Sequence, residues 1–169
     1  MSNENIHNCS KLIGQAKRIY FLEIGYSSIV CEDSNYKFMS IGLNSYNLDD
    51  SHKMITISSI MNEDDLVIPI SHFGETKKII KAVENTKNNN IKVISITEEK
   101  ISTLKNLSDI NLGYISRETI FETGSILLKL GQIFIMNLIY TQVVKDKYSE
   151  SISTNIKTTN AISSFNKNK

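Results

Sequence analysis

The chain has 169 residues, and its 19 Lys and Arg against 18 Asp and Glu leave a formal net charge of +1. This length suits one domain of ordinary size and leaves little room for a second. The hydrophobic share of 40% and the charged share of 22% exclude a disordered chain. The near-neutral balance lacks the basic excess of nucleic-acid-binding domains, so we expect no direct nucleic-acid contact by this chain.

The predicted elements begin with a lead-in helix at 6–17. Near-continuous runs of Val, Ile and Leu then recur, as in strands buried on both faces of a parallel sheet. These runs lie at 18–24, 65–70 and 91–96, with weaker ones at 39–43 and 110–112. Helices are expected between them at 27–38 and 76–86. Alternating strands and helices predict βαβ units and a doubly wound α/β sheet.

The C-terminal part is predicted to be helical. Segment 119–148 reads as one long helix that is apolar on most of its circumference, so it should be buried on more than one side. One side is expected to pack on the sheet and the other to meet a second subunit in a homodimer or higher oligomer. Residues 1–148 are thus predicted to form the domain. Residues 149–169 are predicted to form a polar helical tail using Ile152, Ile156 and Ile162, partly disordered at its end.

Several classes of protein do not fit the sequence. The most hydrophobic segment, 126–140, is shorter than the ~20 residues that a membrane span needs, and residues 1–8 lack the apolar core of a signal peptide. Cys9 and Cys31 form no disulfide or zinc motif. We therefore expect a cytoplasmic protein with reduced thiols, no membrane contact, no metal and no cofactor.

Small and hydroxyl-bearing residues follow the predicted strands, at 25–28, at 71–76 and at Thr97. In an open parallel sheet, ligands bind just beyond these carboxyl ends. Ser71 and Thr76 can donate hydrogen bonds to phosphate oxygens, and Gly74 lets the backbone approach closely. A helix N-terminus also favours negative charge. The pattern predicts an anion cradle; the alternative is that the two hydroxyls only cap the helix.

A family resemblance is carried by the run Ser71-x-Phe73-Gly74-x-Thr76 and by Val-Ile-Ser-Ile-Thr at 93–97. These runs resemble the SIS (sugar isomerase) domain, whose signature is S-x-S-G-x-T after the third strand and I-T after the fourth. Segment 23–27 matches its G-x-G-x-S turn in part. Segments 36–42, 49–52 and 70–77 resemble, more specifically, the sugar-phosphate-sensing half of RpiR-type transcriptional regulators.

The resemblance implies a three-layer αβα sandwich, flavodoxin-like or Rossmann-like, with a five-stranded parallel sheet that binds a sugar phosphate. In these regulators the sugar phosphate modulates DNA binding by a preceding helix-turn-helix domain, which we expect to be absent from this chain. The resemblance places the phosphate on the loop and the sugar hydroxyls at the two neighbouring strand ends. The implied ligand-binding residues are Ser27, Ser28, Ser71, His72, Phe73, Gly74, Glu75, Thr76 and Thr97.

Two residues depart from the family signature. Glu23 stands at the first glycine of the turn, where a carboxylate pointing inward would oppose phosphate. It would otherwise accept hydrogen bonds from sugar hydroxyls or face away. Phe73 replaces the second serine and removes one hydroxyl donor. Glu118 and Glu122 are tentative ligand contacts, or else carboxylates that stabilise the first turn of the long helix.

The expected function is a phosphosugar-binding sensory domain rather than an enzyme. The first alternative is a sugar-phosphate aldose–ketose isomerase of the same superfamily, which needs a general base near the sugar. The candidate bases Glu23, Glu118, Glu122 and His72 form no recognisable acid–base pair. The second alternative is an oligomerisation module with a degenerate ligand site.

Overall fold

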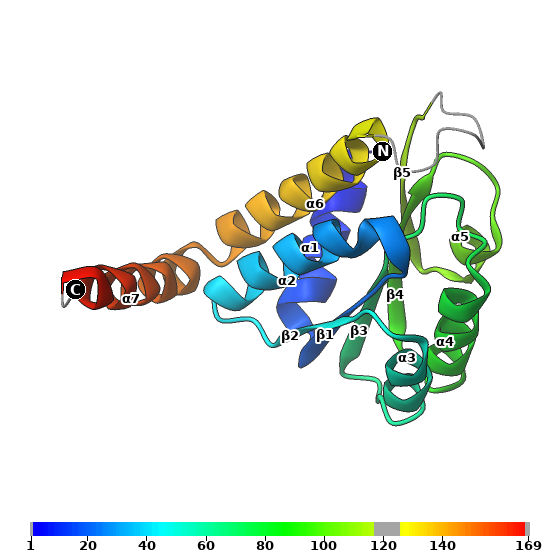
Figure 1. Cartoon of the computed structure of the whole chain (residues 1–169), viewed down its shortest axis with the longest axis horizontal. Helices are drawn as coiled ribbons and strands as arrows, with labels where there is room; N and C mark the ends of the chain where they lie inside the picture. The colour runs from blue at the N-terminus through cyan, green and yellow to red at the C-terminus, as the bar shows by residue number, and fades with distance from the viewer. Residues whose placement is uncertain (1, 117–125, 168–169) are drawn as a thin grey trace.

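The computed structural model describes residues 2–116 and 126–167. Its five strands are all parallel and lie in the order β2-β1-β3-β4-β5, which confirms the predicted five-stranded parallel sheet (Figure 1). The elements follow along the chain as α1 (Asn3–Gln15), β1 (Arg18–Leu22), η1 (Gly25–Ser27, a 3-10 turn), α2 (Ser28–Ser40), β2 (Ser45–Leu48), α3 (Ser51–Ser58), β3 (Asp65–Pro69), α4 (Lys77–Asn88), β4 (Lys92–Glu98), α5 (Thr103–Leu107), β5 (Ile110–Tyr114), α6 (Ile126–Asp146) and α7 (Tyr148–Lys167).

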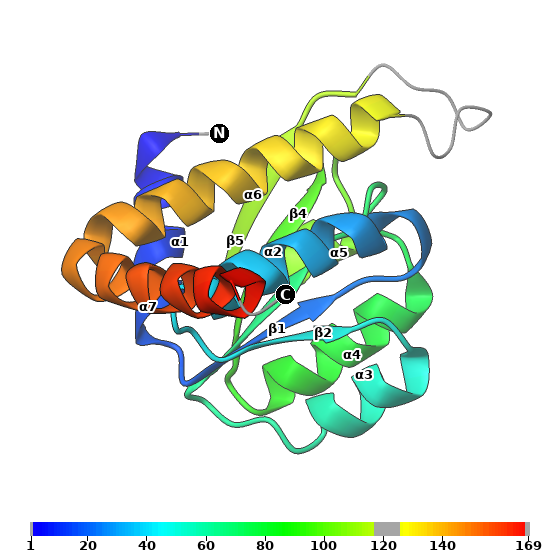
Figure 2. The ribbon, with the colours of Figure 1, turned by 60° about the vertical axis from the view of Figure 1, so that its left-hand side comes forward.

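Helices cover both faces of the sheet. Helices α1, α2 and α6 pack on one face, where their apolar residues share a core with Phe21 and Ile68. Helices α3, α4 and α5 pack on the other face, around Leu22 and Val67 (Figure 2). Because neighbouring residues of a strand point to opposite faces, each strand needs apolar side chains at nearly every position. The predicted three-layer αβα sandwich is confirmed.

Local sequence signals explain where several helices begin. The side chain of Ser2 accepts a hydrogen bond from the Asn5 N–H (3.2 Å) at the start of α1. Asp50 accepts from the N–H groups of His52 and Lys53 at the start of α3. Such caps satisfy N–H groups that have no partner within the helix. Helix α4, expected at 76–86, buries an apolar stripe that includes Ile79, Ala82 and Val83.

The second strand differs from the sequence expectation. It was expected at 39–43, but α2 continues through Ser40 and β2 spans Ser45–Leu48. Ile41 is buried at the end of the helix, and Gly42, with φ at +85°, lets the chain turn there. Strand β2 lies at the edge of the sheet and is buried only at its first and last residues. An edge strand of this kind carries no continuous apolar run.

The predicted long helix corresponds to α6, whose end lies two residues before the expected boundary at 148. Helix α6 ends at Asp146 and α7 begins at Tyr148, while the expected start at 119 lies outside the described residues. Helix α6 buries one side against the sheet, but Leu130 and Phe134 are 53% and 59% exposed. The predicted tail is helical as α7, which projects from the body (Figure 1).

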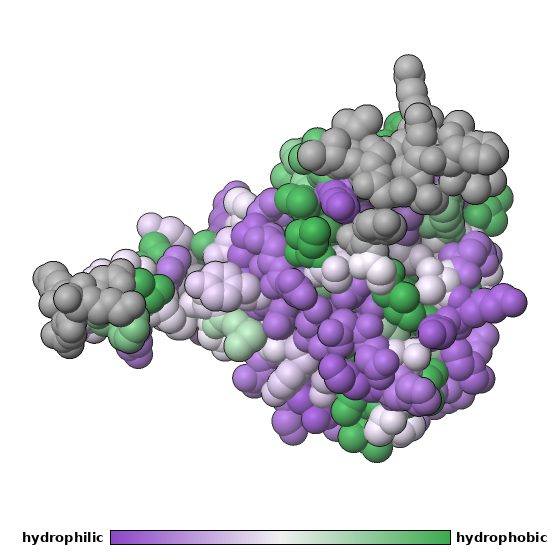
Figure 3. Space-filling model, in the orientation of Figure 1, coloured by the Kyte–Doolittle hydropathy of each residue, from purple (hydrophilic) through white to green (hydrophobic). Residues whose placement is uncertain are grey.

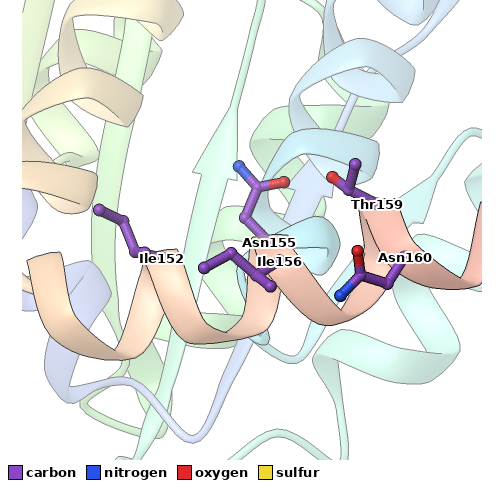
Figure 4. A pocket seen from close by; sticks show the side chains of 5 residues that line it. All are labelled: Ile152, Asn155, Ile156, Thr159 and Asn160. Carbon is purple, nitrogen blue, oxygen red and sulfur yellow. The ribbon is translucent and has the colours of Figure 1, made fainter.

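The projecting helix is polar overall but exposes several hydrophobic side chains, among them Ile156, Ile162 and Phe165. Hydrophobic side chains lie along α7, whereas the face of the body seen beside it is largely hydrophilic (Figure 3). An open hollow on α7 is lined by Ile152, Asn155, Ile156, Thr159 and Asn160, all from this helix (Figure 4). Within the described residues, no helix is long and apolar enough to cross a membrane.

Candidate ligand site

The sheet has a topological switch point between the ends of β1 and β3, and we call the region beyond these two strand ends the crevice. The chain leaves β1 toward β2 on one side and returns to β3 on the other, so the order reverses at this pair. Ligands of open α/β sheets bind at such a switch point, beyond the carboxyl ends of the strands. Leu22 pairs with Pro69, and the Ile70 N–H donates to the Leu22 carbonyl (3.0 Å). The crevice is therefore flanked by Glu23 and Ser71.

The loop 71–76 joins β3 to α4 and carries the predicted anion cradle. Ser71 Oγ and Thr76 Oγ1 lie 3.0 Å apart in a hydrogen bond that either hydroxyl can donate. Thr76 occupies the N-cap position of α4, but its side chain makes no capping bond. The two hydroxyls thus face each other at a helix N-terminus, whose N–H groups and dipole favour an anion.

Gly74 holds this loop close to α5. Its φ of +68° lies in the left-handed region, and an added Cβ would lie 2.7 Å from Ser102 Cβ and 3.3 Å from Thr97 Cγ2. Its carbonyl accepts a hydrogen bond from the Leu104 N–H (3.1 Å). The Glu75 carboxylate accepts from both the N–H (2.7 Å) and the hydroxyl (2.9 Å) of Thr103. Glu75, a predicted ligand residue, therefore ties the loop to α5.

His72 connects the loop to α6. Its Nδ1 lies 2.9 Å from the Tyr114 hydroxyl, which also accepts a hydrogen bond from the buried Gln132 amide (3.0 Å). Gly131 leaves room for the Tyr114 ring, because an added Cβ would lie 2.9 Å from it. The Phe73 ring lies beside the His72 ring, with centroids 4.2 Å apart, and is 42% exposed. His72 is thus half-buried and engaged, not a solvent-facing loop histidine.

The other predicted residues lie at two strand ends. Ser27 ends η1 and Ser28 begins α2, both half-buried and one strand away from the loop. Thr97 is fully buried; its hydroxyl donates to the Glu98 carbonyl (3.0 Å) and accepts from Asn111 (2.9 Å). The structure therefore brings Ser71, Gly74, Thr76 and Thr97 close together. Glu118 and Glu122 lie outside the described residues.

Glu23 follows β1 and is only 1% exposed. Asn47 donates a hydrogen bond to its carboxylate, yet Oε2 of Glu23 and Oδ1 of Asn47 are buried without a partner among the described residues. Burial, together with the nearby carboxylates of Asp49 and Glu32, raises the pKa of the Glu23 carboxyl to about 7. The carboxyl therefore titrates near neutral pH.

Sequence reasoning missed four residues that shape the site. Asn47 lies in the strand that was misplaced, and Ser102, the N-cap of the short helix α5, packs against Gly74. Tyr114 and Gln132 meet His72 only through the fold, so no local signal marks them. The buried Glu98 is the last residue of β4 and forms an ion pair with Lys100 (2.9 Å) that lacks hydrogen-bond alignment. Its position directly after the predicted ligand residue Thr97 could have identified it from the sequence.

Metal ligation has little support in this part of the chain. Across residues 2–116 and 126–167, no three His, Cys, Asp or Glu side chains are grouped so that they could hold a metal ion. The arrangement instead offers hydroxyls and a helix N-terminus at β3, and carboxylate and amide oxygens at β1.

Comparison with known proteins gives a consistent result. The family described as "SIS domain" matches residues 12–141. An uncharacterized HTH-type transcriptional regulator of Clostridium perfringens is 51% identical over 154 residues, covering 91% of this chain and 55% of that protein. The HTH-type transcriptional regulator RpiR of Escherichia coli is 27% identical over 162 residues, covering 96% of this chain and 54% of that protein. The chain thus spans about half the length of these relatives.

A solved structure extends the likeness to the fold. The Vibrio vulnificus NanR protein complexed with ManNAc-6P superposes with a TM-score of 0.91 at 23% identity, covering 97% of this chain and 62% of that one. At this identity the comparison supports the αβα architecture and the helical C-terminal part.

Proposed function

Because the chain belongs to the SIS domain family, we propose that it is the sugar-phosphate-sensing domain of an RpiR-type transcriptional regulator. The observation that carries this proposal is the pair of hydroxyls, Ser71 and Thr76, placed 3.0 Å apart at the N-terminus of α4. Each can turn its hydrogen toward a phosphate oxygen without moving the backbone. Hydrogen bonds to a charged group contribute about 1.5–3 kcal/mol each, so a few support micromolar binding.

The regulatory role is supported by the relatives. Both curated relatives are HTH-type regulators longer than this chain, which covers about half of each, and NanR was solved with a sugar phosphate. We infer that the whole protein reads DNA through a helix-turn-helix segment and that this domain responds to the sugar phosphate. Such a protein would act in the cytoplasm.

Oligomerisation through α6 and α7 is part of the proposal. Leu130 and Phe134 expose apolar surface on α6, and Ile156 and Phe165 on α7 are 55% and 65% exposed. Exposed hydrophobic residues gathered on two helices are typical of protein–protein contacts, and a second copy of the chain would cover them. We expect light scattering to show at least a dimer; a monomer at working concentration would contradict this part.

The site favours a sensor over an isomerase. Isomerisation needs a base and an acid within reach of the same sugar carbons. Among the described residues, His72 is engaged by Tyr114 and Glu23 is buried, and no contact joins the two. We expect no aldose–ketose interconversion with any sugar phosphate that binds. Measurable turnover would show that the chain is an isomerase and would contradict the sensor proposal.

The test measures binding to the loop. Sugar phosphates and inorganic phosphate should raise the melting temperature of the wild-type protein at millimolar concentration. In calorimetry, Ser71→Ala and Thr76→Val should each weaken sugar-phosphate binding by roughly tenfold to a hundredfold, the equivalent of one charged hydrogen bond. Ser59→Ala is the matched control, because its hydroxyl bonds only the Thr56 carbonyl near the end of α3. Unchanged affinity in both loop variants would refute the proposal.

A further inference from the structure

Glu23 and Asn47 leave two buried acceptor atoms without partners. Phe21 pairs with Asn47 across β1 and β2, and Glu23 lies two residues beyond Phe21, so all three point to the α2 face of the sheet. Glu23 Oε2 and Asn47 Oδ1 make no hydrogen bond within the described residues. Native proteins satisfy nearly all buried polar atoms, so a pair of adjacent exceptions calls for a specific explanation.

The same two atoms lie at the crevice. Glu23 follows β1 directly, and Ser71 follows β3, the neighbouring strand, after the bond between Ile70 and Leu22. Neighbouring strands are about 4.8 Å apart. A ligand whose phosphate is held by Ser71 and Thr76 therefore has its remaining atoms within reach of the β1 end. The crevice has one end suited to an anion and another at which the two buried atoms without partners are both acceptors.

The charges around Glu23 are all negative. Asp49 and Glu32 are the charged groups that act on its carboxyl, and in the described part of the chain no ion pair includes Glu23. Asp65 shows the contrast, since it is equally buried at the amino-terminal end of β3 but is paired twice with Arg18 at 2.7 Å. A hydroxyl from a ligand would satisfy the free oxygen of Glu23 but leave its charge unbalanced. An ammonium group satisfies both, since it donates three hydrogen bonds and carries a positive charge.

We propose that Glu23 and Asn47 bind a protonated amine of the ligand, so that the preferred effector is an amino sugar phosphate whose amine is free. This inference rests on the proposed function, because the phosphate end must be held by the loop. The raised pKa of Glu23 is consistent with this inference. A nearby cation stabilises the ionised form of a carboxyl that is otherwise costly to ionise. An N-acetylated or neutral sugar phosphate would leave the carboxylate unbalanced.

The test compares three probes that share a phosphate and differ at one carbon: glucosamine 6-phosphate, glucose 6-phosphate and N-acetylglucosamine 6-phosphate. Calorimetry at pH 7.5 should give the free amine at least a roughly tenfold lower Kd, as for one charge-assisted hydrogen bond. Glu23→Gln keeps the size and removes the charge, and should abolish this preference. Glu32→Gln, an exposed change of the same charge, should keep the preference.

A second measurement needs no variant. An ammonium that contacts Glu23 lowers its pKa, so near pH 7 glucosamine 6-phosphate should release more protons on binding than the acetylated probe. The heat of binding in buffers of different ionisation enthalpy reports this release. Equal affinities for the three probes, a preference that survives Glu23→Gln, or equal proton release would each overturn this inference and leave the proposed function standing. Absence of binding by all three probes and by inorganic phosphate would overturn both.

Discussion

The two ends of the crevice differ in how their polar groups are satisfied. At β3, the loop has internal partners: Ser71 with Thr76, Glu75 with Thr103, and His72 with Tyr114. At β1, Glu23 Oε2 and Asn47 Oδ1 are buried without partners in the described chain. The loop is held in shape before any ligand arrives, whereas the β1 end carries an energetic cost that a ligand or a proton can relieve.

Substitutions at the two ends should therefore change the free energy of unfolding in opposite directions. A change in the tethered loop removes contacts that hold the native state, so it should lower the free energy of unfolding. Removing the charge of Glu23 takes away an unfavourable buried group, so it should raise that free energy. Variants that change stability in the same direction at both ends would contradict this difference.

The largest effect is expected for Gly74→Ala. The positive φ costs a residue with a Cβ about 1–2 kcal/mol, and the overlap with Ser102 adds about 1–3 kcal/mol. Chemical denaturation should show a loss of about 2–5 kcal/mol, with sugar-phosphate binding lost as well. Gly25→Ala is the control, because Gly25 has a φ of +82° but no described atom within 4 Å of an added Cβ. Equal losses in the two variants would show that the packing against Ser102 is unimportant.

The next effect is the pH dependence caused by Glu23. Its pKa is raised from 4.5 to about 7, so the folded protein holds this proton more tightly than the unfolded chain. Wild-type stability should therefore fall as the pH rises through this window. Each pH unit corresponds to about 1.4 kcal/mol, so Glu23→Gln should be more stable than wild type at pH 8 by on the order of 3 kcal/mol.

Denaturation curves at pH 5 and pH 8 check this expectation. The groups facing Glu23 are Asp49, Glu32 and Cys31. The pKa of Asp49 is lowered from 3.8 and that of Cys31 is raised above 9.0, so neither titrates in the window. Glu32→Gln, which removes an exposed charge, should leave most of the slope in place. A slope that persists in Glu23→Gln would assign it to another group.

The smallest of the three effects is expected for Tyr114→Phe. The change removes the hydroxyl that joins His72 to Gln132. The buried Gln132 amide then lacks a hydrogen-bond acceptor, which lowers the free energy of unfolding by about 1–3 kcal/mol. The variant should melt a few degrees lower than wild type. Tyr36→Phe, on a side chain that is 69% exposed, should change little. An unaltered melting temperature in Tyr114→Phe would mean that the link to α6 contributes nothing to stability.

The sequence predicted the central strands because both faces of the sheet are covered by helices. Val67 and Ile68 point to opposite cores, so their strand reads as an apolar run. The edge strand β2 has the polar sequence Ser-Tyr-Asn-Leu and was placed too early. The break between α6 and α7 at Lys147 lies within two residues of the expected boundary at 148, where the sequence changes from apolar to polar.

The candidate site was predictable where its residues are contiguous. The loop 71–76 and its helix form one local pattern, so the hydroxyl pair could be inferred before the fold was seen. Tyr114 and Gln132 are far from His72 in sequence and meet it only in the folded chain. The sequence marked Glu23 as a departure, but the missing partner of its carboxylate depends on the packing of α2 over β1.

The position of His72 between two aromatic rings has a practical consequence. The Phe73 and Tyr114 ring centroids lie 4.2 Å and 5.9 Å from that of His72, close enough for their ring currents to displace its proton resonances. The chain has three histidines, so its imidazole signals in a one-dimensional NMR spectrum are few. His72 is thus a built-in spectroscopic reporter, which allows occupancy of the crevice to be followed in unlabelled protein.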